Sequence, residues 1–529
     1  MSIVSSKRKN FHCKGLGLID IVFISPNNAA VTYQALAETY SAIEPPTWSL
    51  LLAESVRSAG YKPEIIDCLA EALPDNVIVQ RIIEMSPRLI CFVVFGQNVN
   101  AGTTNMSGAV RLAAQIKKNG VTTPIGFIGS HVQALPEETL KREPAIDYVF
   151  LNEGVFALRE LLSFEQVCLN ALQSVSGLAL RIDDKVVFTG PPRVVPQERM
   201  DELLPGYAWD LLPAKNAPLD LYRSPYWHAE YMSEFRSPYA AIQTSIGCPF
   251  KCSFCMINLI NKNDTAPESV ASNYSGMRFW SINVVEKELS KLVALGVKTI
   301  RITDEMFLLN KKYYKPIIEA LIHLNKHDDL RLWVYSRIDT VPTPEELVNI
   351  RKAGIRWLCL GIESGDKKIR LEVSKGKFEQ VDVEQVVAQV EDAGINVMAN
   401  YIYGLPGDTP ETIQQTFELS AKLNTLGWNT YAAMALPGSP LYAKAKEEGQ
   451  LLPSRYEEFS FHSYETIPMS NENMKASEIL RLRDEKFTEY FSRSKFLLRI
   501  EEKFGKMARD NIELMNSKIL RRKIIEEED

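Results

Sequence analysis

The sequence predicts an α/β fold with a doubly wound, Rossmann-like parallel sheet first, a parallel partial (β/α)6 barrel second, and a helical region at the C-terminal end. Two observations support this prediction. Apolar, β-branched runs alternate with segments of helical spacing in two separate series, and a proline-rich stretch lies between the two series. With 529 residues, the chain is also too long for a single core of ordinary size.

The chain divides into four expected regions. They are a sheet domain over residues 1–172, a connector over 173–232, a barrel over 233–445 and a helical domain over 446–529. Within the connector, LALRIDDKVVFTG is typical of a hairpin, and the three prolines of PPRVVPQ then break regular structure.

The first series predicts five buried strands. They are expected at IDIVFISP, KPEIIDC, RLICFVVFG, PIGFIGS and DYVFLNEG, with helices at TWSLLLAESVRSAGY, GAVRLAAQIKKNG, PEETLKRE and VFALRELLS. Ligands of doubly wound sheets bind at the carboxyl ends of the strands. Those ends carry Ser25-Pro26-Asn27, Gly96-Gln97-Asn98, Gly129-Ser130-His131 and Asn152-Glu153-Gly154. No G-x-G-x-x-G follows any of the strands, which weakens a dinucleotide-binding interpretation.

The second series predicts six βα units. Strands are expected at YAAIQTS, KTIRITDE, RLWVYSR, WLCLGIES, NVMANYIYGLP and TYAAMALP, and amphipathic helices separate most of them. Six such units suit a parallel barrel or part of one, with its active site at the C-terminal ends of the strands. The later helical region places Leu480, Phe487 and Phe491 on one face, which indicates packing. The tail RRKIIEEED is expected to be a solvated helix end.

Composition favours a small-molecule partner. The net charge of −6 and the pI near 5.8 give no basic surface for nucleic acid or anionic lipid. No apolar run reaches the ~18 residues that a membrane-spanning helix needs, so we expect no membrane partner. The N-terminal MSIVSSKRKNFHCKG lacks the apolar run of a secretory signal, and the expected location is the cytoplasm.

Three of the eight cysteines lie close together. Cys248, Cys252 and Cys255 have gaps of three and two residues and directly follow the first strand of the second series. The other five are scattered along the chain. A reducing compartment would keep them as free thiols, and we expect them to be small buried side chains. Structural zinc requires four ligands, which the neighbouring sequence does not supply. A cubane iron–sulfur cluster held by three thiolates would leave one iron open for a substrate or cofactor.

The spacing and its surroundings resemble the radical S-adenosylmethionine (radical SAM) superfamily. The motif C-x3-C-x2-C with Phe254 before the third cysteine is followed in order by TDEMF, YSRID, GIESGDKKI and YIYGLPGDTPETI, over some 200 residues. The resemblance implies that Cys248, Cys252 and Cys255 hold a [4Fe-4S] cluster whose open iron binds SAM. An electron from the cluster would then cleave SAM to a 5′-deoxyadenosyl radical.

The same resemblance implies the SAM contacts. Asp304 and Glu305 occupy the position that meets the methionine amine, although the usual glycine pair is absent. Ser336, Arg337 and Glu363 match strand ends that hold the ribose and the sulfonium or carboxylate region. Phe254, Ala435 and Leu436 would border the adenine. An ion pair between Arg337 and Glu363 inside the barrel is the alternative, but charges at strand ends are costly to bury without a partner, which favours ligand binding.

The N-terminal series resembles the cobalamin (B12)-binding domain that precedes the barrel in many radical SAM proteins. EPPTWSLLLAESVRSAGYKPEIIDC, IGFIGSHVQALPEETL and DYVFLNEG carry this resemblance. It implies that Gly129 and Ser130 approach the corrin or its nucleotide tail, and that Glu153 and Gly154 lie nearby, where Asn152 departs from the commoner Gly-Glu-Gly. His131 borders the same strand end. Because D-x-H-x-x-G is absent, we expect no histidine ligand on cobalt.

The implied function is a cobalamin-dependent radical SAM methyltransferase. It would methylate an unactivated carbon of a small molecule through the 5′-deoxyadenosyl radical and methylcobalamin, with electrons from a flavodoxin- or ferredoxin-type donor. A cobalamin-dependent cyclase or rearrangement enzyme, a radical SAM enzyme whose B12 domain is degenerate, and a zinc-bearing binding scaffold are the alternatives. Candidate substrate contacts are aromatic and histidine side chains of the connector and late barrel, which are equally typical of packing between domains, namely Tyr222, Tyr226, Trp227, His228, Tyr403, Trp428 and Tyr431.

Overall fold

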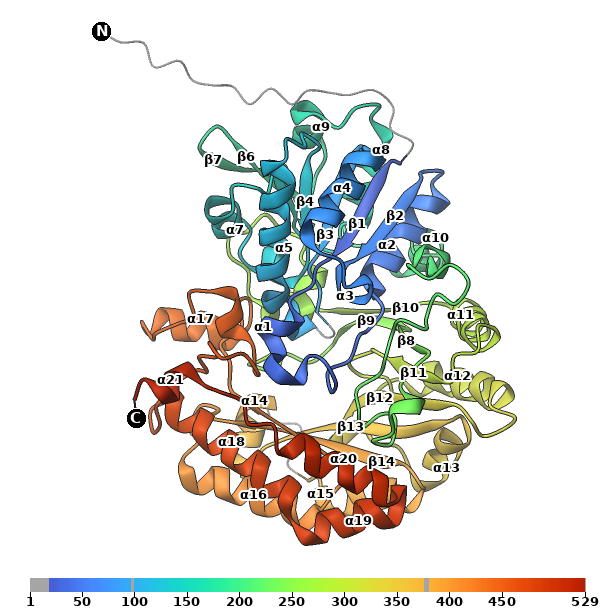
Figure 1. Cartoon of the computed structure of the whole chain (residues 1–529), viewed down its shortest axis with the longest axis vertical. Helices are drawn as coiled ribbons and strands as arrows, with labels where there is room; N and C mark the ends of the chain where they lie inside the picture. Colours follow the sequence, from blue (N-terminus) through green and yellow to red (C-terminus); the bar gives the residue numbers. More distant parts are fainter. Residues whose placement is uncertain (1–18, 97–98, 375–379, 529) are drawn as a thin grey trace.

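Two α/β units and a set of C-terminal helices make up the computed structural model of the chain, which describes residues 19–96, 99–374 and 380–528 (Figure 1). The N-terminal unit lies above the barrel in Figure 1, and the C-terminal helices run along the barrel's lower side. The predicted fold class is confirmed.

The N-terminal sheet has seven strands in the order β2-β1-β3-β4-β5-β6-β7. The first five in this order are parallel, and the last two are antiparallel additions. The strands are β1 Ile21–Ser25, β2 Pro63–Asp67, β3 Leu89–Val93, β4 Ile125–Ile128, β5 Tyr148–Phe150, β6 Leu178–Ile182 and β7 Lys185–Phe188. All five predicted parallel strands are present.

Helices cover both faces of this sheet, because alternate residues of its central strands are buried on opposite sides. Ile21 and Phe23 of β1 pack with α2 and α8, whereas Val22 and Ile24 pack with α4 and α5. The helices of this unit are α1 Ala29–Tyr33, α2 Thr47–Ser58, α3 Cys68–Glu71, α4 Asp75–Met85, α5 Gly102–Lys118, α6 Ser130–Ala134, α7 Pro136–Arg142, α8 Val155–Ser163, α9 Leu169–Ser174 and, in the connector, α10 Met200–Leu203.

The hairpin predicted for the connector belongs to the sheet domain. Its strand β6 pairs antiparallel with β5, with Val149 opposite Ala179 and Phe150 opposite Leu178. The boundary expected at residue 172 is therefore too early. The turn residues of a hairpin predict that its two strands pair with each other. They do not predict which strand of a neighbouring sheet the hairpin will join.

The second unit is an open parallel sheet of six strands in the order β8-β11-β12-β13-β14-β15. These strands are β8 Tyr239–Ile242, β11 Thr299–Ile302, β12 Arg331–Arg337, β13 Ile355–Glu363, β14 Asn396–Tyr403 and β15 Gly427–Ala432. The last strand starts and ends earlier than TYAAMALP predicts. A separate hairpin of β9 Ser245–Cys248 and β10 Gly276–Phe279 follows β8. No pattern in the sequence predicted this hairpin, which carries Cys248, the first of the three clustered cysteines.

Helices of the barrel cover the outer side of its sheet. They are α11 Ile282–Ala294, α12 Lys311–Leu324, α13 Pro344–Lys352, α14 Lys367–Ser374, α15 Val383–Asp392, α16 Pro410–Leu423 and α17 Pro440–Glu447. Several begin with clear capping signals. Thr343 and Glu346 form a capping box at α13, and Asp382 accepts from the backbone N–H of Gln385 at α15.

The C-terminal helices close the β15 side of the barrel. They are α18 Ala476–Ser492, α19 Ser494–Phe504, α20 Lys506–Asn516 and α21 Lys523–Glu526. The predicted apolar face of α18 packs on β15, where the rings of Phe487 and Phe491 contact Trp428. The tail differs from its predicted solvated state, because Arg522 is buried and forms an ion pair with Asp484.

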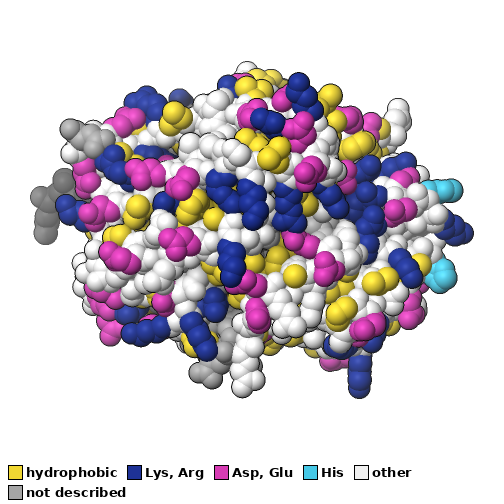
Figure 2. All heavy atoms as spheres, turned by 90° about the horizontal axis from the view of Figure 1, so that it is seen from below, with side chains coloured by type: hydrophobic (Ala, Val, Ile, Leu, Met, Phe, Trp, Pro, Cys, Tyr) yellow, Lys and Arg dark blue, Asp and Glu magenta, His cyan; other side chains and the backbone are white. Residues whose placement is uncertain are grey.

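Seen from below, the molecule presents basic, acidic and apolar side chains intermixed over one face (Figure 2). Within the three described ranges, every helix is too short or too polar to cross a lipid bilayer.

Candidate active site

The cysteine loop starts at the end of β9, between the two strands of the β9–β10 hairpin. Cys248 is the last residue of β9 and pairs with Gly276 of β10. Gly247 before it has φ of 89°, and a Cβ atom at this position would come within 2.2 Å of the Gly276 carbonyl oxygen. A side chain is therefore excluded where the backbone turns toward Cys252 and Cys255.

Neighbouring elements fix the loop from three directions. The backbone N–H of Ser253 donates to the carbonyl oxygen of Val373 in α14, and its own carbonyl oxygen accepts from the N–H of Leu441 in α17. Asn100, at the foot of α5, accepts from the N–H of Met256 at 3.3 Å. The cysteine loop is thus positioned by the barrel and by the N-terminal domain together.

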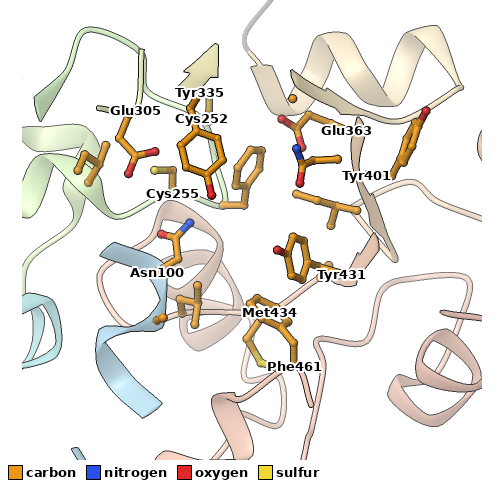
Figure 3. Close-up of a pocket in the computed structure, with 18 of the residues that line it drawn as sticks. Asn100, Cys252, Cys255, Glu305, Tyr335, Glu363, Tyr401, Tyr431, Met434 and Phe461 are labelled. Carbon is orange, nitrogen blue, oxygen red and sulfur yellow. The ribbon is translucent and has the colours of Figure 1, made fainter. Parts of the chain in front are cut away.

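All three cysteines line one cavity of about 320 Å³ (Figure 3). Its walls come from the C-terminal ends of the barrel strands, the foot of α5, the α1 segment, and the chain between α17 and α18. The residues of this cluster cavity that were predicted as site residues are Cys248, Cys252, Phe254, Cys255, Glu305, Ser336, Arg337, Glu363 and Leu436. The barrel fold thus brings together side chains that lie up to 188 positions apart in the sequence.

Burial keeps the three thiols protonated until a metal binds them. It raises the pKa of Cys248 to about 12 and that of Cys252 to about 11, and it raises the pKa of Cys255 well above the ordinary thiol value. Nearby Arg337 opposes the shift at Cys248 and Cys252. Binding of iron must therefore displace protons from this loop.

The donor set fits a multinuclear cluster better than a single ion. In the described ranges no three His, Cys, Asp or Glu side chains are grouped closely enough to hold one metal ion. Around one zinc ion the sulfur atoms would lie about 4 Å apart, because each Zn–S bond is about 2.3 Å long. Cys248, Cys252 and Cys255 all line one cavity, and three thiolates suit an iron–sulfur cluster that keeps one iron open to a ligand.

Two carboxyl groups face the cavity near the cysteines. Burial raises the pKa of both Glu305 and Glu363 to about 7, while Arg301 opposes the shift at Glu305 and Arg337 opposes it at Glu363. Glu363 has φ of 66°, and the register of β13 with β14 shifts between Gly361 and Glu363. The irregular strand end directs this carboxyl group into the cavity (Figure 3). Both acids suit a cationic ligand group.

Asp304 has a different environment from its neighbour Glu305. Its carboxylate accepts hydrogen bonds from the backbone N–H and hydroxyl of Thr244, both at 2.6 Å, and from the Ser245 hydroxyl at 2.5 Å. The side chain is buried and does not line the cluster cavity. Asp304 therefore connects β11 to the start of β9, and its predicted contact with SAM stays a prediction.

The remaining SAM-site candidates divide in the same way. Arg337 lines the cavity, pairs with Asp339 at 2.7 Å and lies over the ring of Phe250, with the guanidinium carbon 3.7 Å from the ring centroid. Arg337 also acts on Glu363, because its charge opposes the rise in the pKa of that carboxyl group caused by burial. Ser336, 2.7 Å from the Thr340 hydroxyl, also lines the cavity. Ala435 does not, because it is packed in a core behind the wall.

A second cavity lies at the carboxyl ends of β1, β2 and β3. We call it the strand-end cavity, and its described walls enclose about 130 Å³. It shares five lining residues with the cluster cavity, namely Thr32, Tyr33, Ala101, Thr104 and Glu305. The two spaces are therefore neighbours across a common wall. Gln97 and Asn98, predicted at this edge, lie outside the described residues.

The walls of the strand-end cavity suit a large flat ligand only in part. Trp48 and Phe95 stack with centroids 5.1 Å apart, and hydroxyl groups of Ser25, Thr47 and Thr104 also line the space. No His or Cys side chain is among its described lining residues. A corrin ring is larger than 130 Å³, so its binding here requires these walls to move apart or space from the cluster cavity.

The predicted corrin contacts, all in described residues, line neither cavity. Gly129 has φ of 156°, and a Cβ there would meet Val94. Ser130 is fully buried beside Gly102. His131, whose pKa burial lowers to about 3, has Nδ1 3.2 Å from the Thr103 hydroxyl. The predicted contacts with cobalamin therefore stay predictions.

Glu153 lies in a contact between the sheet domain and the β9–β10 hairpin, whereas Gly154 packs within the sheet domain. Glu153 is fully buried and pairs with Arg278 of β10 at 2.8 Å. It also accepts from the backbone N–H of Val195, and burial raises its pKa against the opposing effect of Arg278. Gly154 has φ of 73° and lies against Ile128. The buried ion pair between Glu153 and Arg278 thus links the sheet domain to the β9–β10 hairpin.

Sequence analysis missed two walls of the cluster cavity. One is Thr32 and Tyr33 of α1, and the other is the segment Phe459–His462 between α17 and α18. Among the expected substrate contacts, Tyr431 lines the cavity. The others do not line the cavity, and Trp227, for example, is partly buried against Trp333 and Trp357. The missed walls lack a local motif, and only the folded chain brings them to the barrel.

Comparison with known proteins agrees with both units. The sequence matches the Radical SAM superfamily over residues 242–420 and the B12 binding domain over residues 33–162. An uncharacterized methyltransferase of Pyrococcus horikoshii is 26% identical over 88% of this chain and 92% of its own length. The anaerobic magnesium-protoporphyrin IX monomethyl ester cyclase of Cereibacter sphaeroides is 22% identical over 87% of this chain and 68% of its own.

A solved structure has the same architecture. The radical S-adenosylmethionine methyltransferase TsrM of Kitasatospora setae, with tryptophan substrate and a SAM analogue bound, aligns with a TM-score of 0.62 at 16% identity. The alignment covers 94% of this chain and 99% of that one. At this identity the likeness shows the fold. The two family matches, at residues 33–162 and 242–420, show that the chain contains a B12-binding domain followed by a radical SAM domain.

Proposed function

We propose that the protein is a cobalamin-dependent radical SAM methyltransferase that acts on an unactivated carbon of a small molecule. One observation carries the proposal furthest. The cavity lined by Cys248, Cys252 and Cys255 adjoins the strand-end cavity of the B12-binding domain through shared walls. A substrate at the shared wall would be within reach of ligands bound in both cavities.

The cofactors, when bound, supply a 5′-deoxyadenosyl radical and a methyl group. The side chains of the cavity have the supporting roles. Cys248, Cys252 and Cys255 would hold the cluster after losing their protons. Glu305 and Glu363 would bind the cationic ammonium of SAM in their ionised forms, and Arg337 is the cation available for a carboxylate. Fixing these groups in one orientation is the main contribution of the protein.

The surrounding structure would protect the reaction. Aromatic side chains from α1, β15 and the segment before α18 cover the cavity on the side away from the cysteines. Exclusion of water keeps a reactive radical from side reactions. We place the reaction in the reducing cytoplasm, with a flavodoxin- or ferredoxin-type protein as the electron donor, because the free thiols have to remain reduced.

Methyl transfer is favoured over ring closure because two methyltransferases among the similar proteins, the Pyrococcus horikoshii protein and TsrM, align over 92% and 99% of their own lengths. A cobalamin-dependent cyclase is the second candidate, because the Cereibacter enzyme is similar over most of this chain. A degenerate B12 domain is a further alternative, because the strand-end cavity is smaller than a corrin ring.

Product analysis tests the proposal. The full-length protein is purified anaerobically, reconstituted with iron, sulfide and cobalamin, and supplied with SAM and a reductant. We expect both 5′-deoxyadenosine and S-adenosylhomocysteine, together with a corrin absorption spectrum of the bound protein. Release of 5′-deoxyadenosine alone would contradict methyl transfer, and absence of corrin absorption would indicate a degenerate B12 domain.

Cysteine variants provide the control for the cluster itself. Replacing Cys248, Cys252 and Cys255 by alanine should abolish both iron and sulfide binding and the release of 5′-deoxyadenosine. Cys168→Ala, a partly exposed thiol of the sheet domain, should change neither. Stoichiometric zinc without sulfide in the unaltered protein would instead favour a zinc-bearing scaffold.

A further inference from the structure

The cluster cavity has two chemically different ends. Cys252 and Glu305 lie at one end, and Met434 and Phe461 lie at the other (Figure 3). We call the second end the distal subsite, and its side chains are Tyr33, Tyr431, Met434, Phe459, Phe461 and His462. We propose that the distal subsite binds an uncharged, planar, unsaturated ring that carries a hydrogen-bond acceptor. This substrate class rests on the proposed function.

The distribution of charge excludes an ionised substrate group from the distal subsite. The charged side chains among the described lining residues are Glu305, Arg337 and Glu363, all on loops or strand ends that face the cysteines. The one titratable imidazole of the subsite, His462, is neutral, because burial and the nearby Arg483 and Arg522 lower its pKa to about 3. Arg483 and Arg522 do not line the cavity and are already paired with Asp484, so an ionised group bound here would lose its hydration without gaining a counter-ion on the cavity wall.

Paired rings give the subsite flat apolar surfaces. The rings of Tyr431 and Phe461 lie 4.6 Å apart, centroid to centroid, at 47°. Those of Tyr33 and His462 lie 5.6 Å apart at 34°. Met434 adds a polarizable thioether, which packs well against aromatic rings. Offset and tilted faces of this kind bind a planar ring better than a puckered aliphatic one.

A chain of amides orients the hydroxyl of Tyr431 as a hydrogen-bond donor. Asn429 Nδ2 donates to this hydroxyl oxygen and to Asn400 Oδ1, and Asn400 Nδ2 donates in turn to the carbonyl oxygen of Met398 at 3.1 Å. Because the oxygen already accepts a bond from Asn429, the O–H proton is available to a ligand in the cavity. The ligand therefore needs an acceptor at this point.

The subsite is held in shape by bonds between segments far apart in the sequence. The Ser460 hydroxyl donates to the carbonyl oxygen of Thr32 at 3.1 Å, and Gln34 Nε2 donates to the carbonyl oxygen of His462 at 2.7 Å. The wall from α1 and the wall before α18 are thus fixed to each other. A preformed site of this kind spends little binding free energy on ordering.

Isothermal titration calorimetry on the cluster-reconstituted, full-length protein tests the proposal. Three matched probes share one carbon skeleton. They are 2-naphthol, which is planar and neutral, 2-naphthoate, which is planar and charged, and decahydro-2-naphthol, which is neutral and puckered. We expect 2-naphthol to bind at least tenfold more tightly than either of the others, with or without SAM present.

Variants locate the binding. Tyr431→Phe, which keeps the ring and removes the hydroxyl, should weaken 2-naphthol binding by roughly tenfold, as expected for the loss of one hydrogen bond. Phe461→Leu should weaken 2-naphthol more than decahydro-2-naphthol. Tyr464→Phe is the matched control, because the Tyr464 hydroxyl bonds Glu526 at the surface, and it should change nothing.

Each outcome decides one question. Equal binding of 2-naphthol and 2-naphthoate, or equal affinity of Tyr431→Phe and the unaltered protein, would overturn the subsite. Displacement of 2-naphthol by SAM would show that the rings belong to the SAM site, which would also overturn it. Failure of the proposed function is read separately, from iron, sulfide and the SAM products, because ring binding needs no turnover.

Discussion

Glu44 and Arg301 form a buried ion pair between the two α/β units. Arg301 Nη1 lies 2.7 and 2.6 Å from the two carboxylate oxygens of Glu44, and both side chains are almost fully buried. Glu44 precedes α2 in the sheet domain, and Arg301 lies in β11 of the barrel. The Arg301 guanidinium also lies over the ring of Trp333, with its carbon 4.5 Å from the centroid. The pair fixes the strand-end cavity against the barrel.

Breaking this pair should destabilise the protein strongly. Arg301→Met leaves Glu44 buried without a cation, at an expected cost of about 3–5 kcal/mol. The double variant Glu44→Gln, Arg301→Met should recover much of the loss, because no charge is then left unpaired. Thermal unfolding measures both. As a control, Lys298→Met removes an exposed pair with Asp329 and should cost less than about 1 kcal/mol. A double variant less stable than Arg301→Met would contradict this account.

Asp304 and Glu305 should respond differently to substitution, although they are adjacent. Asp304→Ala removes the acceptor of three hydrogen bonds from Thr244 and Ser245, so we expect a Tm several degrees lower. Glu305→Gln should leave the Tm nearly unchanged and weaken SAM binding, because this side chain faces the cavity. Thermal scans and SAM titration of the reconstituted protein measure the two effects. The opposite pattern would show that Asp304 contacts the ligand.

The pH dependence of stability should include a contribution from Asp67. Burial raises its pKa from 3.8 to about 6, against the opposing hydrogen bonds from Ala70 N–H and the Tyr222 hydroxyl. A raised carboxyl pKa gives stability that is fully present below pH 3.8 and is lost as pH rises through about 6. Asp67→Asn does not titrate. Relative to the unaltered protein, its stability should therefore rise by roughly 1–3 kcal/mol between pH 4 and pH 8.

Thermal scans of both proteins across this pH range measure the difference. Asp75→Asn is the control, since Asp75 forms a surface pair with Arg111 at the start of α4. A constant difference in Tm between Asp67→Asn and the unaltered protein would show that Asp67 is ionised throughout.

The adjacent residues Arg521 and Arg522 should also respond differently to substitution. Arg522 is buried, pairs with Asp484 at 2.8 Å and donates to the carbonyl oxygen of Ser463, next to the distal subsite. Arg522→Ala should lower the Tm and weaken 2-naphthol binding while the cluster stays bound. Arg521→Ala should change neither quantity, because its side chain is exposed and pairs with Glu526. Loss of iron from Arg522→Ala would contradict a local role.

The sequence by itself determined the elements and the metal loop. Continuous apolar, β-branched runs predicted the parallel strands, because a strand covered by helices on both faces of its sheet buries nearly all its side chains. The three cysteines lie within eight positions, so their convergence on one centre needs little more than the local backbone. Strand-end positions such as Glu363 and Arg337 follow from the rule that parallel strands open their carboxyl ends at one edge.

Tertiary structure alone decided which of these side chains face the cavity. Asp304 and Glu305 differ by one position, yet one meets Thr244 and the other meets the ligand space. Tyr33 and His462 lie 429 positions apart and still share a wall, as the Gln34 bond to the His462 carbonyl shows. Contacts of this kind depend on how whole domains pack, because no local pattern of polarity or periodicity records which distant surface a side chain will meet.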